Sequence, residues 1–196
     1  SIVKDIPCCV SSLFRCFAVS LFAVILTGCA SSAQIPGMTV PDAQAKAHAY
    51  DASLHTNVQL QEVNGGEKTN PLWTSEIDGP DFRAALQQSL GNAGLLGTDS
   101  APYALRANLL RVDQPLFGLD FEVTSEVEYT LIEVATNKVV MREVVRTPFT
   151  AGVGDAFIAI KRLRLANEGS ARTNIDAFLK RLSTLQIEAK QISLQH

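Results

Sequence analysis

The chain has 196 residues, of which 46% are hydrophobic and 19% are charged, and its formal net charge is −3. This length accommodates one globular domain with a hydrophobic core, and it excludes a two-domain enzyme of ordinary size. The mildly acidic balance argues against a nucleic-acid partner, because phosphate binding needs clustered positive charge.

The first 29 residues have the pattern of an export signal, and they contain all four cysteines of the chain: Cys8, Cys9, Cys16 and Cys29. Residues 17–26 form an uncharged apolar run. A run of about ten residues suits a signal peptide and is far shorter than the roughly 20 residues that span a bilayer. The run ends in Leu26-Thr27-Gly28-Cys29, which resembles the lipobox of bacterial lipoproteins. The alternatives are an ordinary signal peptide with a chance cysteine and an internal apolar segment.

The resemblance to a lipobox implies cleavage between Gly28 and Cys29, a diacylglyceryl group on the Cys29 sulfur and a fatty acyl group such as palmitate on the new N-terminus. Ala30 and Ser31 after the cysteine imply sorting to the periplasmic face of the outer membrane, with the inner membrane as the alternative. Cleavage would leave Cys29 as the one remaining cysteine. The exported chain would then have no disulfide, no thiol nucleophile and no cysteine-based metal site.

Composition divides the chain into four parts. Residues 1–28 are predicted to be the signal peptide. Residues 29–52 are rich in Ala, Ser, Gln and Pro without sustained periodicity, which predicts a lipidated flexible tether. A periplasmic domain is expected over residues 53–185, and a C-terminal tail over residues 186–196.

The first strand and the first helix of this domain follow from local patterns. Val58 and Leu60 alternate with polar residues, which predicts a half-buried strand. Asp78 followed by Gly79-Pro80 is typical of a helix start. The helix is expected to run to about Gly94 and to bury one face: Phe82, Ala85, Leu86, Ser89 and Leu90.

Three further strands are predicted by alternation, at residues 103–109, 121–131 and 139–145. A tight turn at residues 136–138 joins the last two strands into a hairpin. Val139, Met141 and Val145 are assigned to the buried face, and the register that allows this places Arg146 opposite Glu126 or Glu128.

The last element is predicted to be a helix from about Asp155 to Leu185. At 100° per residue its apolar side chains fall in one arc: Phe157, Ile160, Leu163, Ile175, Phe178, Leu179, Leu182 and Leu185. Gly169-Ser170 interrupts the helix pattern, and we expect a kink or a division there.

The order β-α-β-β-β-α predicts an α+β fold with two helices packed on one face of a four-stranded mixed sheet. In this arrangement the first, second and fourth strands finish at the same end, which we expect to lie away from the point where the tether enters. The loops at that end span residues 64–77, 113–119 and 147–156 and contain five apolar candidates for partner binding: Trp73, Leu116, Phe117, Phe149 and Val153. The alternative is that these side chains fold back as a lid on the core.

Three cations near the start of the last helix form a second candidate surface: Lys161, Arg162 and Arg164. Positive charge at a helix N-terminus opposes the helix dipole, so helix stability does not explain them. They are candidates for binding the phosphates of anionic lipids, and a solvated helix face is the alternative.

The spacing of apolar residues resembles that of small outer-membrane-biogenesis lipoproteins, first the LptE-type lipopolysaccharide-assembly lipoproteins and then the ABC-transport auxiliary lipoproteins. Four segments carry the resemblance: FRAALQQSL at residues 82–90, YAL at 103–105, VEYTL at 127–131 and NIDAFLKRL at 174–182. The resemblance implies a domain that supports a barrel protein or a lipid transporter and catalyses nothing itself.

No residue pattern in the chain indicates an enzyme. The three histidines, His48, His55 and His196, are scattered, and the sequence contains no HExxH motif and no nucleophile elbow. We therefore expect no metal and no cofactor other than the covalent lipid on Cys29. The expected function is that of an accessory in envelope assembly or lipid transport with an envelope protein as partner and lipopolysaccharide or phospholipid as a second candidate ligand. The alternative is an adaptor that binds envelope proteins without lipid.

Overall fold

The computed structural model describes residues 31–68 and 75–187. The described chain contains four helices, one 3-10 turn and four strands, in the order α2 (Ile35–Met38), α3 (Asp42–Ala45), η2 (Ala52–Leu54), β1 (Val58–Gly65), α4 (Gly79–Asn92), β2 (Tyr103–Asp113), β3 (Phe121–Glu133), β4 (Lys138–Ala151) and α5 (Ala159–Ser183). The predicted lipobox, with Gly28 and Cys29, and the predicted partner-binding residue Trp73 lie outside the described residues. Within those residues, no helix combines the length and the apolar character needed to span a bilayer.

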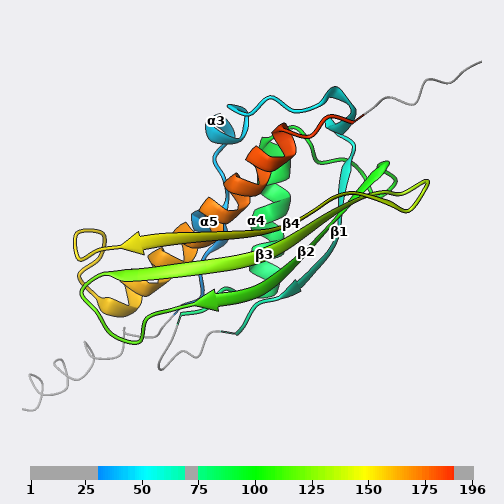
Figure 1. Ribbon diagram of the computed structural model, residues 1–196. Helices are drawn as coiled ribbons and strands as arrows, with labels where there is room; N and C mark the ends of the chain where they lie inside the picture. The colour runs from blue at the N-terminus through cyan, green and yellow to red at the C-terminus, as the bar shows by residue number, and fades with distance from the viewer. Residues whose placement is uncertain (1–30, 69–74, 188–196) are drawn as a thin grey trace, which may run out of the picture.

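The four strands form one mixed sheet in the order β1-β2-β3-β4. β1 pairs with β2 in parallel, and β2, β3 and β4 pair in antiparallel fashion. The long helices α4 and α5 lie on one face of this sheet, behind it in the view of Figure 1. The predicted α+β class and the predicted four-stranded mixed sheet with two packed helices are confirmed.

The hairpin register follows from which face is buried. Arg146 lies opposite Glu126, as the sequence predicts. A bulge between Leu131 and Ile132 shifts the pairing near the turn, so Val139 is 50% exposed instead of facing the core. Alternation alone does not reveal such a bulge, because the inserted residue reverses the side-chain direction only beyond it.

The core lies between the sheet and the two long helices. The Tyr129 ring on β3 stacks on Phe178 of α5 with ring centroids 4.0 Å apart. Around this pair, α4 and α5 bury the apolar faces that their periodicity predicts: Phe82, Ala85, Leu86 and Leu90 on α4, and Ile175, Phe178, Leu179 and Leu182 on α5.

α5 differs from its prediction in two places, at its first residue and at Gly169. It begins at Ala159 rather than near Asp155, because Asp155 accepts a hydrogen bond from the Gly152 amide (2.8 Å) within a preceding turn. Phe157 therefore precedes the helix and is 91% exposed. The helix continues unbroken through Gly169, where the missing side chain leaves room for the Phe149 ring of β4.

The prediction of a flexible tether is wrong for residues 33–52. Four apolar residues of this segment are fully buried, namely Ala33, Met38, Val40 and Ala45. The segment crosses the outer sides of α4 and α5, and the Val40 amide donates to Ser89 Oγ (3.0 Å) while Asn92 Nδ2 donates to the Val40 carbonyl (2.8 Å). Such a segment has no helical or strand period, because its turns are short and each apolar side chain fills a separate gap.

Candidate functional site at the loop end of the sheet

β1, β2 and β4 all run toward one end of the sheet, the end at which α5 begins (Figure 1, left). We call it the loop end. The β2–β3 connection, residues 114–120, and the β4–α5 connection, residues 152–158, lie there. At the opposite end, β3 and β4 are joined by the short turn that the sequence predicts.

Exposed apolar side chains gather at the loop end. Five of the nine strongly exposed large hydrophobic residues in the described chain lie on these two connections, and we call them the apolar end: Leu116, Phe117, Leu119, Phe157 and Ile158. Their exposed fractions range from 69% to 91%. A small cavity of about 160 Å³, lined by Leu116, Ile160 and Leu163 among others, joins the β2–β3 loop to the start of α5. Soluble proteins rarely leave such clusters exposed unless the cluster contacts something.

The predicted partner-binding residues do not stay together. Leu116 and Phe117 are exposed, so for these two the alternative of a core lid is wrong. Phe149 instead packs between Gly169 and Arg172 of α5, with the Arg172 guanidinium 6.0 Å from the ring centroid. Val153 is half-buried. Trp73 lies outside the described residues, so its role stays a prediction.

Three members of the apolar end were missed by sequence reasoning: Leu119, Phe157 and Ile158. The spacing of Phe157 to Ile160 fits a helical period, which predicts that Phe157 belongs to the apolar arc of the last helix. The signal that could have separated Phe157 and Ile158 from the helix is the Gly152-Val153-Gly154-Asp155 turn, since Gly and Asp interrupt helices.

The three cations do not form the predicted lipid-binding surface. Arg162 is only 5% exposed, and its Nη1 donates to the Ala156 carbonyl (2.7 Å) and the Phe157 carbonyl (3.2 Å) while its guanidinium lies over the Phe121 ring. Arg164 Nη1 donates to Ser31 Oγ (3.0 Å), and its Nε lies 3.4 Å from a Glu168 carboxylate oxygen. Lys161 alone of the three is exposed. The two arginines hold the β4–α5 turn and the N-terminal segment in place, contacts that helix periodicity does not reveal.

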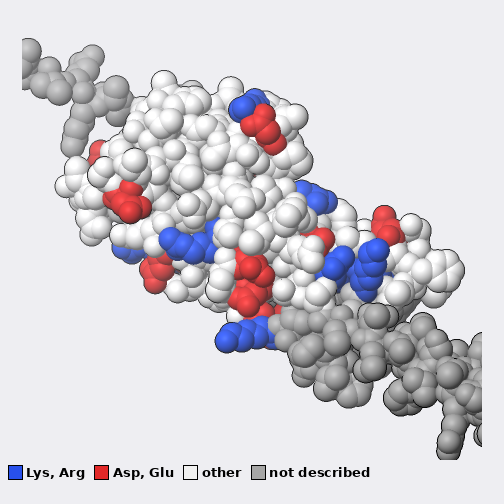
Figure 2. Space-filling model, turned by 180° about the vertical axis from the view of Figure 1, so that it is seen from behind, with Lys and Arg blue, Asp and Glu red and all other residues white. Residues whose placement is uncertain are grey.

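Charges elsewhere are mixed in sign. Figure 2, which looks onto the helical side, shows small groups of both signs and no continuous patch of one sign. On the sheet, Asp113 Oδ2 lies 2.8 Å from Arg111 Nη2 and 3.5 Å from Arg146 Nη2. The hydrogen bond from Arg111 to Asp113 raises the pKa of the guanidinium above its usual value. No cluster of three or more His, Cys, Asp or Glu that could hold a metal ion occurs within residues 31–68 and 75–187.

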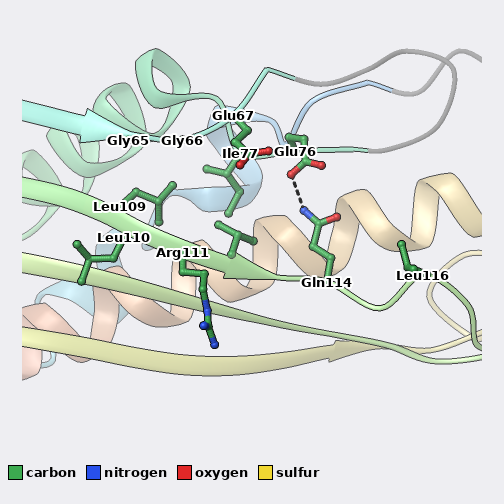
Figure 3. Close-up of a pocket in the computed structure, with 11 residues that line it drawn as sticks. Gly65, Gly66, Glu67, Glu76, Ile77, Leu109, Leu110, Arg111, Gln114 and Leu116 are labelled. Carbon is green, nitrogen blue, oxygen red and sulfur yellow. Dashed lines mark hydrogen bonds between the residues drawn. The ribbon is translucent and has the colours of Figure 1, made fainter.

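A groove of about 440 Å³ lies beside the outer part of β2 (Figure 3). Pairing between β1 and β2 ends at Gly65 and Leu109, whereas β2 continues to Asp113. Beyond that point β3 is the one strand partner of β2 among the residues that the structure describes. It pairs with Arg111, Val112 and Asp113, whereas Leu110 lies at a bulge. Gln114 Nε2 donates to Glu76 Oε2 (2.8 Å) across the far side of the groove, and Leu116 extends it toward the apolar end.

No protein-family model matches the chain, and no curated protein matches it significantly. Solved structures that are similar in part include the following three. The protein XCC0632 of Xanthomonas campestris, from the DUF330 family, is 9% identical, with a TM-score of 0.49 over 70% of this chain and 91% of that one. PelC of Paraburkholderia phytofirmans, solved as a dodecamer, is 16% identical, with a TM-score of 0.46 over 69% and 94%. A minor lipoprotein of Acinetobacter baumannii is 10% identical, with a TM-score of 0.44 over 66% and 94%. Similarity at this level establishes neither a shared family nor a shared function.

Proposed function

We propose that the chain is a bacterial lipoprotein, acylated at Cys29, that serves as a non-catalytic accessory in envelope assembly or lipid transport. The observation that carries this proposal is Leu26-Thr27-Gly28-Cys29 directly after an uncharged apolar run. Ala30 and Ser31 favour the periplasmic face of the outer membrane, and the inner membrane is the alternative. An anchor at Cys29 would place the domain against the membrane, because packed residues begin only four positions later, at Ala33.

The substitution Cys29→Ser tests the anchor. It removes the sulfur that would carry the diacylglyceryl group, so we expect the variant to leave the membrane fraction and to lose incorporation of labelled palmitate. Cys16→Ser is the matched control, because Cys16 lies in the part that processing would remove, and this variant should stay in the membrane fraction. A Cys29→Ser protein that fractionates like the unmodified chain would contradict lipidation.

The accessory role needs a surface for an envelope partner, and we place that surface in the groove beside β2. A strand end without a neighbour on one side can accept an extended segment from another protein by main-chain hydrogen bonds. Leu110, which is 46% exposed on the groove wall, would then contact a side chain of that segment.

Photo-crosslinking in intact cells tests this surface and separates the two functions. A photoreactive residue at position 110 should capture one envelope protein, whereas the same residue at exposed Lys46 on the helical side should not. Lipid extraction of the captured complex then decides between the alternatives: co-purified lipopolysaccharide or phospholipid supports a role in lipid transport, and a lipid-free complex supports an adaptor. Equal capture at both positions would reject the groove.

A further inference from the structure

The described chain begins at the loop end of the domain, not at the opposite end. Ser31 accepts hydrogen bonds at its Oγ from Arg164 Nη1 (3.0 Å) and at its carbonyl from Ser75 Oγ (2.7 Å). Arg164 lies about 8 Å along the axis from the first residue of α5, and about 28 Å separate it from the last. The expectation that the chain enters away from the apolar loops is therefore wrong, because residues 31–57 first run along the helices before β1 starts at the far end.

This position determines where a lipid anchor would emerge. Cys29 precedes Ser31 by two residues, so its Cα lies within about 7 Å of the Ser31 Cα. An acyl group on Cys29 therefore leaves the protein at the loop end, beside the apolar end. This step rests on the lipidation in the proposed function.

We propose that the apolar end inserts into the interfacial layer of the same membrane leaflet that holds the acyl chains of Cys29. Its five side chains come from two adjacent loops and are 69–91% exposed. The outermost atoms at this end are uncharged in Figure 2, where it lies on the right. Stable membrane attachment commonly takes two elements, such as an acyl chain and an apolar surface that enters the headgroup region. The domain then stands on the membrane at its loop end, and the β3–β4 turn points away from the membrane.

The charges near the apolar end indicate which lipids it needs. Lys161 is exposed beside it, and so are the acidic residues Asp120 and Asp155. The Asp155 carboxylate accepts a hydrogen bond from the Gly152 amide. The two acidic residues offset the positive charge of Lys161, so attraction to anionic headgroups does not explain binding of the apolar end to a membrane. Insertion is apolar in origin and should occur equally in zwitterionic phosphatidylcholine.

Quenching by brominated lipids tests the insertion in the full acylated chain. In a Trp73→Phe background, which removes the one natural tryptophan, we introduce Phe117→Trp at the apolar end. The control is Val134→Trp, a 50% exposed position near the turn at the opposite end. In vesicles of brominated phosphatidylcholine, we expect quenching at position 117 to exceed that at position 134 at least threefold.

Flotation of the vesicles separates this inference from the anchor. Protein that floats with the vesicles but is quenched equally at both positions keeps the anchor and overturns the insertion. Protein that does not float contradicts the anchor and the insertion together. A third outcome is that the tryptophan at position 117 escapes lipid quenching while a photoreactive residue at the same position captures an envelope protein in cells. That result would assign the apolar end to a protein partner and also overturn the proposal.

A second measurement avoids the tryptophan background. Charge substitutions at two exposed positions, Leu119→Glu and Phe157→Glu, should leave the fold intact and weaken insertion. The acylated double variant should then exchange between vesicles several times faster than the natural chain. The matched pair at the far end, Val134→Glu and Val139→Glu, should exchange at the natural rate, and equal rates for both pairs would overturn the proposal.

Discussion

A small number of buried polar side chains on α5 connect this helix to the sheet. Asn174 is fully buried, and its Nδ2 donates to the carbonyls of Val145 (2.8 Å) and Ser125 (3.1 Å). Its Oδ1 accepts the Tyr129 hydroxyl (2.9 Å), and complete burial raises the pKa of that phenol well above its usual value, so the hydroxyl keeps its proton. Asn174 thus connects β3 and β4 to the middle of α5.

Substitution of Asn174 by leucine should lower the free energy of unfolding by about 3 kcal/mol. Leucine is similar in volume, but it leaves the Tyr129 hydroxyl and two strand carbonyls without this partner, and each unmet buried group costs about 1–3 kcal/mol. Urea unfolding followed by circular dichroism measures the change. Asn108→Leu, at an exposed site on the open face of the sheet, is the control and should shift stability by less than about 0.5 kcal/mol. Equal effects of the two substitutions would show that the buried network contributes little.

At the scale of elements, the contact between α5 and β4 depends on a residue without a side chain. A Cβ on Gly169 would overlap the Phe149 ring, whereas a Cβ on Gly91 in α4 would meet only Leu96 Cδ2, at 4.0 Å. One residue along, Ser170 Oγ accepts the Ser125 amide (2.9 Å), which fixes the distance between α5 and the sheet. The helix cannot easily move outward to relieve an overlap at Gly169.

These two glycines should respond to alanine in opposite directions. Alanine favours a helix interior over glycine by about 1 kcal/mol. Gly91 lies exposed in the last turn of α4, so Gly91→Ala should gain part of this and raise the midpoint temperature. Overpacking costs about 1–3 kcal/mol, so Gly169→Ala in the middle of α5 should lower the midpoint temperature despite its gain in helix propensity. Thermal unfolding of the two variants measures the difference. Combining Gly169→Ala with Phe149→Leu should restore part of the loss; a Gly169→Ala variant as stable as Gly91→Ala would refute the steric argument.

At the scale of the whole molecule, residues 33–52 pack across the outer sides of α4 and α5, and we call this segment the strap. The Gln34 amide donates to Glu168 Oε1 (3.0 Å), and Arg172 Nη1 donates to the Gly37 carbonyl (2.7 Å). Met38, the residue after Gly37, is fully buried. The strap also holds the start of the described chain at the loop end, which is what would bring a lipid on Cys29 next to the apolar end.

Truncation of Met38 to alanine should therefore destabilise the domain and loosen the strap. Removing a buried methionine side chain costs about 2–5 kcal/mol, and a free tether would show no such effect. Urea unfolding gives the loss of stability, and limited proteolysis should cut the variant earlier within residues 31–57. Lys46→Ala, at a site where the side chain is 61% exposed, is the control. Proteolysis of the natural chain within this segment at the rate of an unfolded peptide would contradict the packed strap.

Local periodicity specifies the four strands and the two long helices of this domain, the pairing of β3 with β4 and much of the core. Alternating residues in β3 and β4 bury one face and so set Arg146 against Glu126, while the 3.6-residue period selects Phe178 and Leu182 as core residues. The resemblance to a lipobox likewise rests on four adjacent residues, and both the motif and its processing stay predictions.

Contacts between residues far apart in the sequence determine the packing of the N-terminal segment, the direction of Arg162 and the place where the domain begins. Ser31 meets Arg164 and Gln34 meets Glu168 across more than 130 positions, and such pairs have no spacing that a sequence pattern could show. They bury the segment expected to be free, and Arg162 is turned inward by the carbonyls of a turn that helix periodicity does not mark. They also bring the start of the domain to the apolar end, because the path of the chain across its own helices depends on packing rather than on local propensity.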